Sequence, residues 1–159
     1  MDKDGMSRTK FADAQIGMDI ADLAKSSEQA ASVIWASECA ERVLHFFESE
    51  RPYDDRPRAA IKACRDWRRI GTFKMSEVRR IALSAHAAAR AAAEGPARFA
   101  ARSAGHALAT VHVPAHSIAA ASYAAKAIWA NDPQEAVRHV AEERDWQYRR
   151  LIDLVDHRQ

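Results

Sequence analysis

Residues 82–130 read ALSAHAAARAAAEGPARFAARSAGHALATVHVPAHSIAAASYAAKAIWA, and alanine fills almost every second position. Alanine has the highest helix propensity because it loses no side-chain entropy on entering a helix. Its small side chain also allows neighbouring helices to approach closely. Gly95-Pro96 and Pro114 interrupt the stretch, so we expect three short helices that pack into a tight layer.

Apolar residues on both sides of this stretch recur with a helical period, and no segment shows a sustained two-residue alternation. The sequence therefore predicts an all-α fold with about seven helices. Glycine, proline and capping residues place the helix starts near Ser7, Ser27, Arg56, Ser76, Pro96, Pro114 and Pro133. Helices joined by short turns favour a compact up-down array or a short helical solenoid.

Particular residues predict how several of these helices begin and end. Gly71 is expected to stop the third helix, because glycine adopts the left-handed conformation at a helix C-terminus without strain. Ser76 is the expected cap of the fourth helix. For the last helix, Asp132 is the expected cap and Glu135 the capping-box acid, with Pro133 in the first turn. The buried stripe of the first helix is predicted to contain Phe11, Ala14, Met18 and Ala21.

The length and composition fit one all-α domain over residues 1–159, in which residues 1–26 form a peripheral N-terminal helix. The formal net charge of +2 does not favour strong non-specific binding to nucleic acid. No apolar run is long enough to cross a bilayer, and the N-terminus lacks the apolar core of a signal peptide, so a cytoplasmic location is expected. Cys39 and Cys64 belong to no cysteine motif, and we expect both to behave as small buried hydrophobes.

Four histidines fall within the alanine-rich stretch: His86, His106, His112 and His116. Imidazole is a common ligand of transition metals, which makes these residues candidates for a metal site. Pro114 separates His112 from His116, however, and neither an HExxH motif nor a nearby carboxylate accompanies the pair. Serine and threonine side chains in the same stretch can instead form hydrogen bonds with the imidazoles between helices. The prediction is therefore that the chain binds no metal or other cofactor.

A loop bounded by Pro52 and Pro57 is the strongest candidate for contact with a partner. The residue before each proline is driven towards an extended conformation, so the chain between them cannot be continuous helix. Loops held by rigid elements often supply binding residues. The candidates for partner binding are Tyr53, Asp54, Asp55, Arg56, Arg58 and Arg65. Because acids and arginines alternate here, a solvated, ion-paired surface is the alternative interpretation.

No pattern in the chain predicts a reaction. The five glycines are scattered rather than gathered in a phosphate-binding loop, and there is no GxSxG nucleophile motif. We therefore expect a protein that is not an enzyme and has no catalytic residues. Two other functions stay open: a helical metal- or ligand-binding protein that uses the histidines, and nucleic-acid binding by the arginines of residues 56–80.

Four segments of the chain carry a resemblance to a known family, and RPRAAIKACRDW and HVPAH are the least generic parts of them. The segments are RPRAAIKACRDW at residues 56–67, AHAAAR at 85–90, ARSAGHALATVHVPAHSIAAASYAAKA at 101–127 and ERDWQYRRL at 143–151. Together they resemble a family of small, alanine-rich bacterial proteins described as immunity proteins, and we assign the resemblance to residues 56–157. It implies an all-α protein that binds a cognate toxin and thereby neutralises it inside the producing cell.

Overall fold

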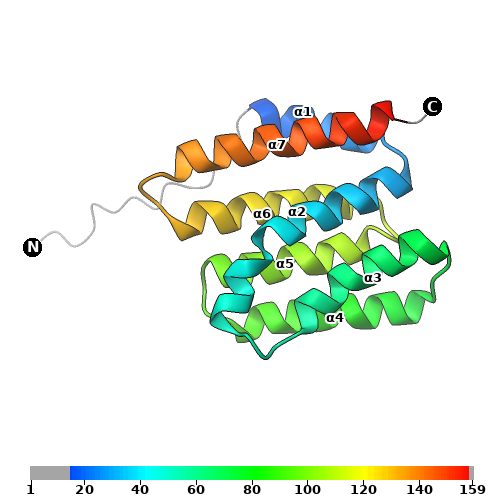
Figure 1. Ribbon diagram of the computed structural model, residues 1–159, viewed down its shortest axis with the longest axis horizontal. Coiled ribbons are helices and arrows are strands. Elements are labelled where there is room, and N and C mark those ends of the chain that lie inside the picture. Colours follow the sequence, from blue (N-terminus) through cyan, green and yellow to red (C-terminus); the bar gives the residue numbers. More distant parts are fainter. Residues whose placement is uncertain (1–14, 158–159) are drawn as a thin grey trace, which may run out of the picture.

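The computed structural model describes residues 15–157, and in that range the chain forms seven α-helices and no strand (Figure 1). The helices are α1 (Gln15–Lys25), α2 (Gln29–Glu50), α3 (Arg56–Ile70), α4 (Met75–Ala91), α5 (Pro96–Ala109), α6 (His116–Asn131) and α7 (Ala136–Asp156). The predicted all-α fold with about seven helices is therefore confirmed. None of the helices described is both long enough and apolar enough to span a membrane.

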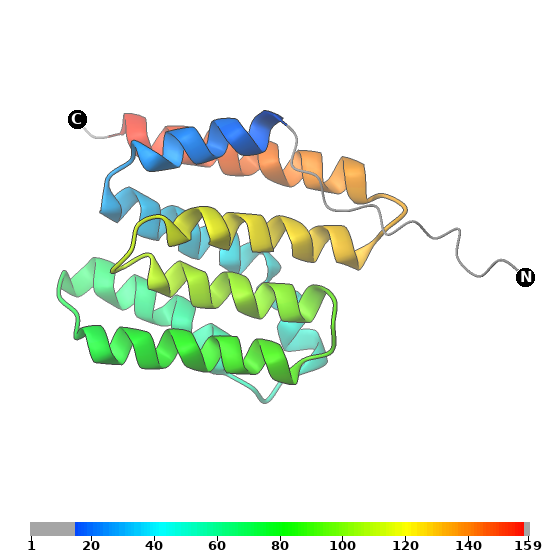
Figure 2. The same cartoon turned by 180° about the vertical axis from the view of Figure 1, so that it is seen from behind.

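The alanine-rich helices α4, α5 and α6 lie side by side as one layer (Figure 2). Helix α5 is in the middle, and α2 and α3 pack across one face of the layer. Helices α1 and α7 pack on each other beyond α6. The close approach is possible because the side chains between the helices are small: Ala100, Ala101, Ala104 and Ala107 of α5 are fully buried. The tight central layer that the alanine content predicts is present.

Larger side chains from α2 and α3 fill the space behind this layer. Trp35, Phe47 and Ile61 are fully buried, and each contributes about 1.5–3 kcal/mol by leaving water. Cys39 and Cys64 lie in the same core as free thiols. Burial raises the pKa of Cys64 to about 12, so this thiol stays protonated and unreactive. The prediction that both cysteines act as small hydrophobes is confirmed.

Glycine and proline mark the helix boundaries in the middle of the chain. Gly71 ends α3 in the left-handed conformation, with φ of 79°, as predicted. Gly95 has φ of 138° directly before α5, a conformation that a residue with a side chain rarely adopts. Helix α4 begins at Met75, so Ser76 lies inside its first turn and the predicted cap is wrong.

The start of α7 also differs from the prediction. The helix begins at Ala136 and is preceded by a turn, rather than starting at Pro133. Asp132 is the residue that follows the end of α6, so it closes that helix and does not cap the next one. Glu135 pairs with Arg138 at 2.9 Å instead of closing a capping box. Glu135 is the residue directly before α7, and its side chain makes this ion pair and no capping hydrogen bond.

The buried side of α1 is not the predicted stripe. Phe11 and Ala14, together with the predicted start at Ser7, lie outside the described residues. Met18 is 61% exposed, so its predicted burial is wrong. The side chains that pack inward are Ile16, Ile20, Leu23 and Ala24. Turning this set towards α7 removes more apolar area from water than turning the smaller predicted set would.

Buried polar side chains fasten α7 to its neighbours. Gln147 is fully buried; its Oε1 accepts a hydrogen bond from Arg144 Nη1 at 2.8 Å, and its Nε2 donates to the carbonyl of Ala121 in α6 at 3.0 Å. Glu143 is also buried and pairs with Arg42 of α2, whose Nη2 lies 2.9 Å from Glu143 Oε2. Burial raises the pKa of Glu143, although the bonds from Arg42 act in the opposite direction. The ERDWQYRRL segment therefore holds residues that dock α7.

Candidate functional site

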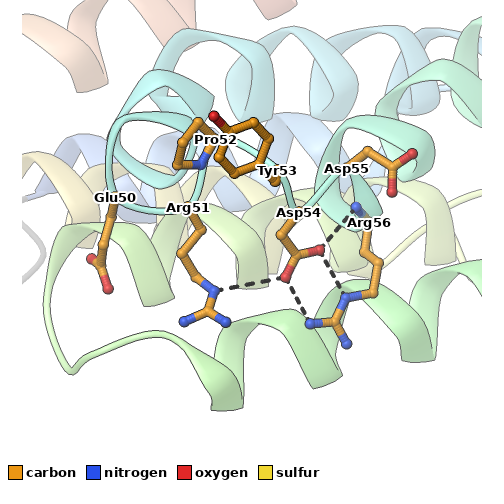
Figure 3. A pocket seen from close by; sticks show the side chains of 7 residues that line it. All are labelled: Glu50, Arg51, Pro52, Tyr53, Asp54, Asp55 and Arg56. Atoms are coloured by element: carbon orange, nitrogen blue, oxygen red, sulfur yellow. Dashed lines mark hydrogen bonds and ion pairs between the residues drawn. The ribbon is translucent and has the colours of Figure 1, made fainter.

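The loop between α2 and α3 lines an open hollow of about 570 Å³ (Figure 3). Asp54 is at its centre and accepts hydrogen bonds from Arg56 Nε at 2.8 Å and Arg56 Nη2 at 2.7 Å. Arg51 Nε lies 3.8 Å from the same carboxylate. The hydrogen bonds from Arg56 lower the pKa of Asp54, although partial burial opposes them. The carboxylate is therefore ionised and held between two arginines, which makes the loop well ordered.

The loop is also tied to the connection between α4 and α5. Arg51 Nη1 donates a hydrogen bond to the carbonyl of Ala91 at 3.1 Å, and the backbone N–H of Ala93 donates to Glu50 Oε1 at 3.1 Å. These bonds join residues about forty positions apart in the chain, so no local sequence pattern predicts them. They fix the loop against the rest of the fold.

Tyr53 is the most exposed residue of this loop. Its exposed fraction is 100%, and Figure 3 shows it beside Pro52, pointing away from the bonds around Asp54. Asp55 is exposed as well. A fully exposed aromatic ring on an ordered loop is unusual for a side chain that serves only the fold. The loop can therefore present Tyr53 and Asp55 to another molecule without rearrangement.

Arg58 and Arg65, the other two predicted contact residues, lie along α3 and face acids of α2. Arg58 Nη1 donates to Glu41 Oε1 at 2.8 Å and its Nη2 donates to Glu48 Oε1 at 2.7 Å. These two bonds raise the pKa of Arg58. Arg65 Nη2 is 3.5 Å from Glu41. The structure thus groups four of the six predicted residues around the hollow and places these two at the contact between α2 and α3.

The histidines of the alanine-rich layer come together. The ring centroids of His86 in α4 and His106 in α5 are 4.8 Å apart, and those of His106 and His116 in α6 are 5.2 Å apart. The Nδ1 atoms of His106 and His116 are 3.0 Å apart, so one of these nitrogens donates its proton to the other. The ring centroid of His112 lies 6.1 Å from that of His116. The rings meet because three helices of the layer each supply one histidine, and the turn between α5 and α6 supplies His112.

Tyr123 and Phe99 extend this group, although no sequence motif marks them. The Tyr123 ring stacks on His106 with centroids 5.3 Å apart and an interplanar angle of 9°. The Phe99 ring centroid is 6.2 Å from that of Tyr123. Both lie seven positions from a histidine on their own helix, a spacing that places them on the same side. We call these rings the aromatic cluster: His86, Phe99, His106, His112, His116 and Tyr123.

Gly105 and Arg102 position the ring of His86. A Cβ atom at Gly105 would lie 2.7 Å from His86 Nε2, closer than real Cβ atoms approach other atoms. Only glycine therefore lets the ring lie against α5 as it does. Arg102 Nη1 donates a hydrogen bond to His86 Nδ1 at 3.3 Å. The ring is thus held on one edge by a guanidinium and on another by the backbone of α5.

Burial lowers the pKa of both His86 and His106 to about 4. The positive charge of Arg102 contributes to both of these shifts, and that of Arg90 contributes to the shift of His86. Both imidazoles are therefore neutral at pH 7, the form that binds metals. Within residues 15–157, however, no group of three or more histidine, cysteine or acidic side chains is arranged to hold a metal ion. The rings instead form a stacked, uncharged surface with arginines beside it.

Comparison with known proteins identifies the family. A family model described as Imm-5 like putative immunity protein matches residues 22–154. The matched range contains the α2–α3 loop, the aromatic cluster and the buried polar residues of α7. No curated protein and no solved structure matches the chain. The resemblance of the four sequence segments to immunity proteins is confirmed, and the chain belongs to the Imm-5 like family of putative immunity proteins.

Proposed function

We propose that this protein binds a cognate bacterial toxin in the cytoplasm of the producing cell and neutralises it by direct protein–protein contact. The observation that supports this function most strongly is the family match over residues 22–154. Neutralisation by contact needs surface complementarity and no chemical step. In this proposal the protein acts by binding alone and uses neither catalytic residues nor a cofactor.

The α2–α3 loop is the surface that we propose for this contact. Tyr53 and Asp55 are free to touch the toxin, while Asp54 and its two arginines hold the loop in place. Because the loop is ordered before binding, little conformational entropy is lost on association. Exposed tyrosines on such loops often dominate the binding energy of an interface. Arg58, whose side chain is 40% exposed, extends the surface along α3 together with Arg65.

The experiment is co-expression with the toxin encoded by the neighbouring gene. Cells that make both proteins are expected to grow, and the two proteins are expected to co-purify. Tyr53→Ala should weaken the affinity by about 2 kcal/mol, or about 30-fold, measured by calorimetry. The matched control is Val137→Ala, which trims a side chain that is 75% exposed on α7 and should leave the affinity unchanged.

Two results would count against this proposal at different levels. Cells that are not protected, with no complex recovered, would refute the immunity function itself. Protection and tight binding that are insensitive to Tyr53→Ala would leave the function standing but show that the toxin binds elsewhere on the molecule.

A further inference from the structure

The layer of α4, α5 and α6 has a second face, opposite the one that α2 and α3 cover, and no helix of the described chain packs on it (Figure 2). Residues spaced three or four apart place one stripe of each helix on this face. We call it the outer face, and its residues are Arg79, Leu83, His86 and Arg90 of α4, Phe99, Arg102 and His106 of α5, and His116, Tyr123 and Lys126 of α6. The outer face therefore contains most of the aromatic cluster.

The ten residues that define the outer face include four cations, Arg79, Arg90, Arg102 and Lys126, and no acid. Among residues 15–157, no ion pair joins Arg79, Arg90, Arg102 or Lys126 to a carboxylate. Other arginines of the chain behave differently, because most of them pair with an acid; Arg150, for example, pairs with Glu38 at 2.6 Å. Four cations on one face thus lack the acidic partners that most other arginines of residues 15–157 have.

The aromatic rings give this face a rigid, partly apolar centre. His86, Phe99, His106 and Tyr123 are all half-buried, and contacts between neighbouring rings fix them in place. Arg102 and Lys126 lie against the rings, with Lys126 Nζ 4.8 Å from the centroid of Tyr123. Half-buried aromatic rings with arginines beside them are the composition of the energetically dominant part of protein interfaces.

We propose that the outer face is a second docking surface, which binds an acidic surface of the partner protein. Carboxylates of that surface would pair with Arg90, Arg102 and Lys126, while its side chains pack on the rings between them. This inference rests on the proposed function, since it takes the toxin as the partner. Four cations in a chain of net charge +2 are few for the phosphate contacts of a nucleic-acid surface, so an acidic protein surface fits better.

Paired charge reversals test this surface. The variant R90E/K126E changes two cations on the outer face. The control K25E/R149E makes the same change in net charge at exposed side chains of α1 and α7, away from both proposed contact surfaces. Affinities are measured by calorimetry at low and moderate salt for three probes: the toxin of the neighbouring gene, poly-L-glutamate and a single-stranded oligonucleotide. Circular dichroism verifies that each variant is folded, and R90Q/K126Q replaces the reversal if it is not.

We expect the wild-type protein to bind the toxin and poly-L-glutamate with affinities that fall as salt rises. R90E/K126E should lose about tenfold or more for both probes, and K25E/R149E should change by less than about threefold. Equal toxin affinity of the two double variants would overturn the inference, as would an outer face that binds the oligonucleotide but not poly-L-glutamate. A wild-type protein that binds poly-L-glutamate through this face but not the toxin would refute the proposed function alone.

Discussion

Gly105 determines how closely His86 can lie on α5. Replacing it with alanine would place a Cβ atom 2.7 Å from Nε2 and 2.8 Å from Cε1 of that ring. The ring must then move away from Arg102 and His106, so we expect Gly105→Ala to destabilise the protein by about 1–2 kcal/mol. This would happen even though alanine by itself favours a helix over glycine by about 1 kcal/mol. Urea unfolding measures the change.

The matching control is the same substitution in a His86→Ala background. Without the ring there is no collision, so the helix propensity of alanine should dominate and Gly105→Ala should become neutral or stabilising by up to about 1 kcal/mol. An identical loss of stability in both backgrounds would show that the contact between His86 and Gly105 has no part in the effect.

The neutral histidines make the stability of the protein depend on pH. Their folded pKa values of about 4 lie below the value near 6.5 that an unfolded histidine has, so the unfolded chain binds more protons between these limits. Stability from His86 and His106 is therefore present above pH 6.5 and is lost as the pH falls towards 4. After discounting for solvent screening, the loss should be on the order of 1–2 kcal/mol.

Thermal unfolding at a series of pH values measures this dependence. The difference between the wild type and the variant H86Q/H106Q isolates the histidines, because acids such as Glu143 titrate in both proteins. The melting temperature of the variant should fall less than that of the wild type between pH 7 and pH 4.5. Parallel curves for the two proteins would mean that the histidines do not change their protonation on unfolding.

At the scale of elements, the buried side chain of Gln147 is one of those that fasten α7 to the rest of the fold. Gln147 Oε1 accepts a hydrogen bond from Arg144 and its Nε2 donates one to a carbonyl of α6, so Gln147→Ala would remove both bonds and leave a cavity in the core. We expect a loss of about 2 kcal/mol or more in the free energy of unfolding, measured in urea. Gln134→Ala, in the exposed turn before α7, is the control and should cost less than about 0.5 kcal/mol. Similar small losses in both variants would exclude a special role for Gln147.

At the scale of the whole molecule, we expect the fold to need no metal ion. The chain is long enough to bury a core without a metal or a disulfide, and its central layer is filled with small apolar side chains. Treatment with EDTA should leave the melting temperature unchanged, and untagged protein should contain less than about a tenth of an equivalent of zinc, nickel or iron. A stoichiometric metal, with a melting temperature that falls on chelation, would favour the metal-binding alternative instead.

Much of the architecture could be predicted from local signals. The left-handed conformation at Gly71 and the Gly95-Pro96 break determine where helices stop and start, because they restrict the backbone whatever packs around it. The start of α7 and the buried side of α1 could not be predicted in the same way. In both cases two local arrangements compete, and contacts in the folded chain decide between them. Glu135 forms an ion pair instead of a cap, and Met18 is exposed instead of buried.

The sequence by itself determined the all-α fold, the tight alanine-rich layer and the position of an exposed loop between two prolines. Only the tertiary structure decided that His86, His106 and His116 meet on one face, beside arginines that pair with no acid of residues 15–157. It also decided that Arg58 is engaged by acids of α2. The physical reason is the distance along the chain over which each effect acts. Helix propensity and backbone restriction act between residues that are close in sequence. The aromatic cluster, in contrast, depends on the register of α4, α5 and α6, which the packing of the whole core sets.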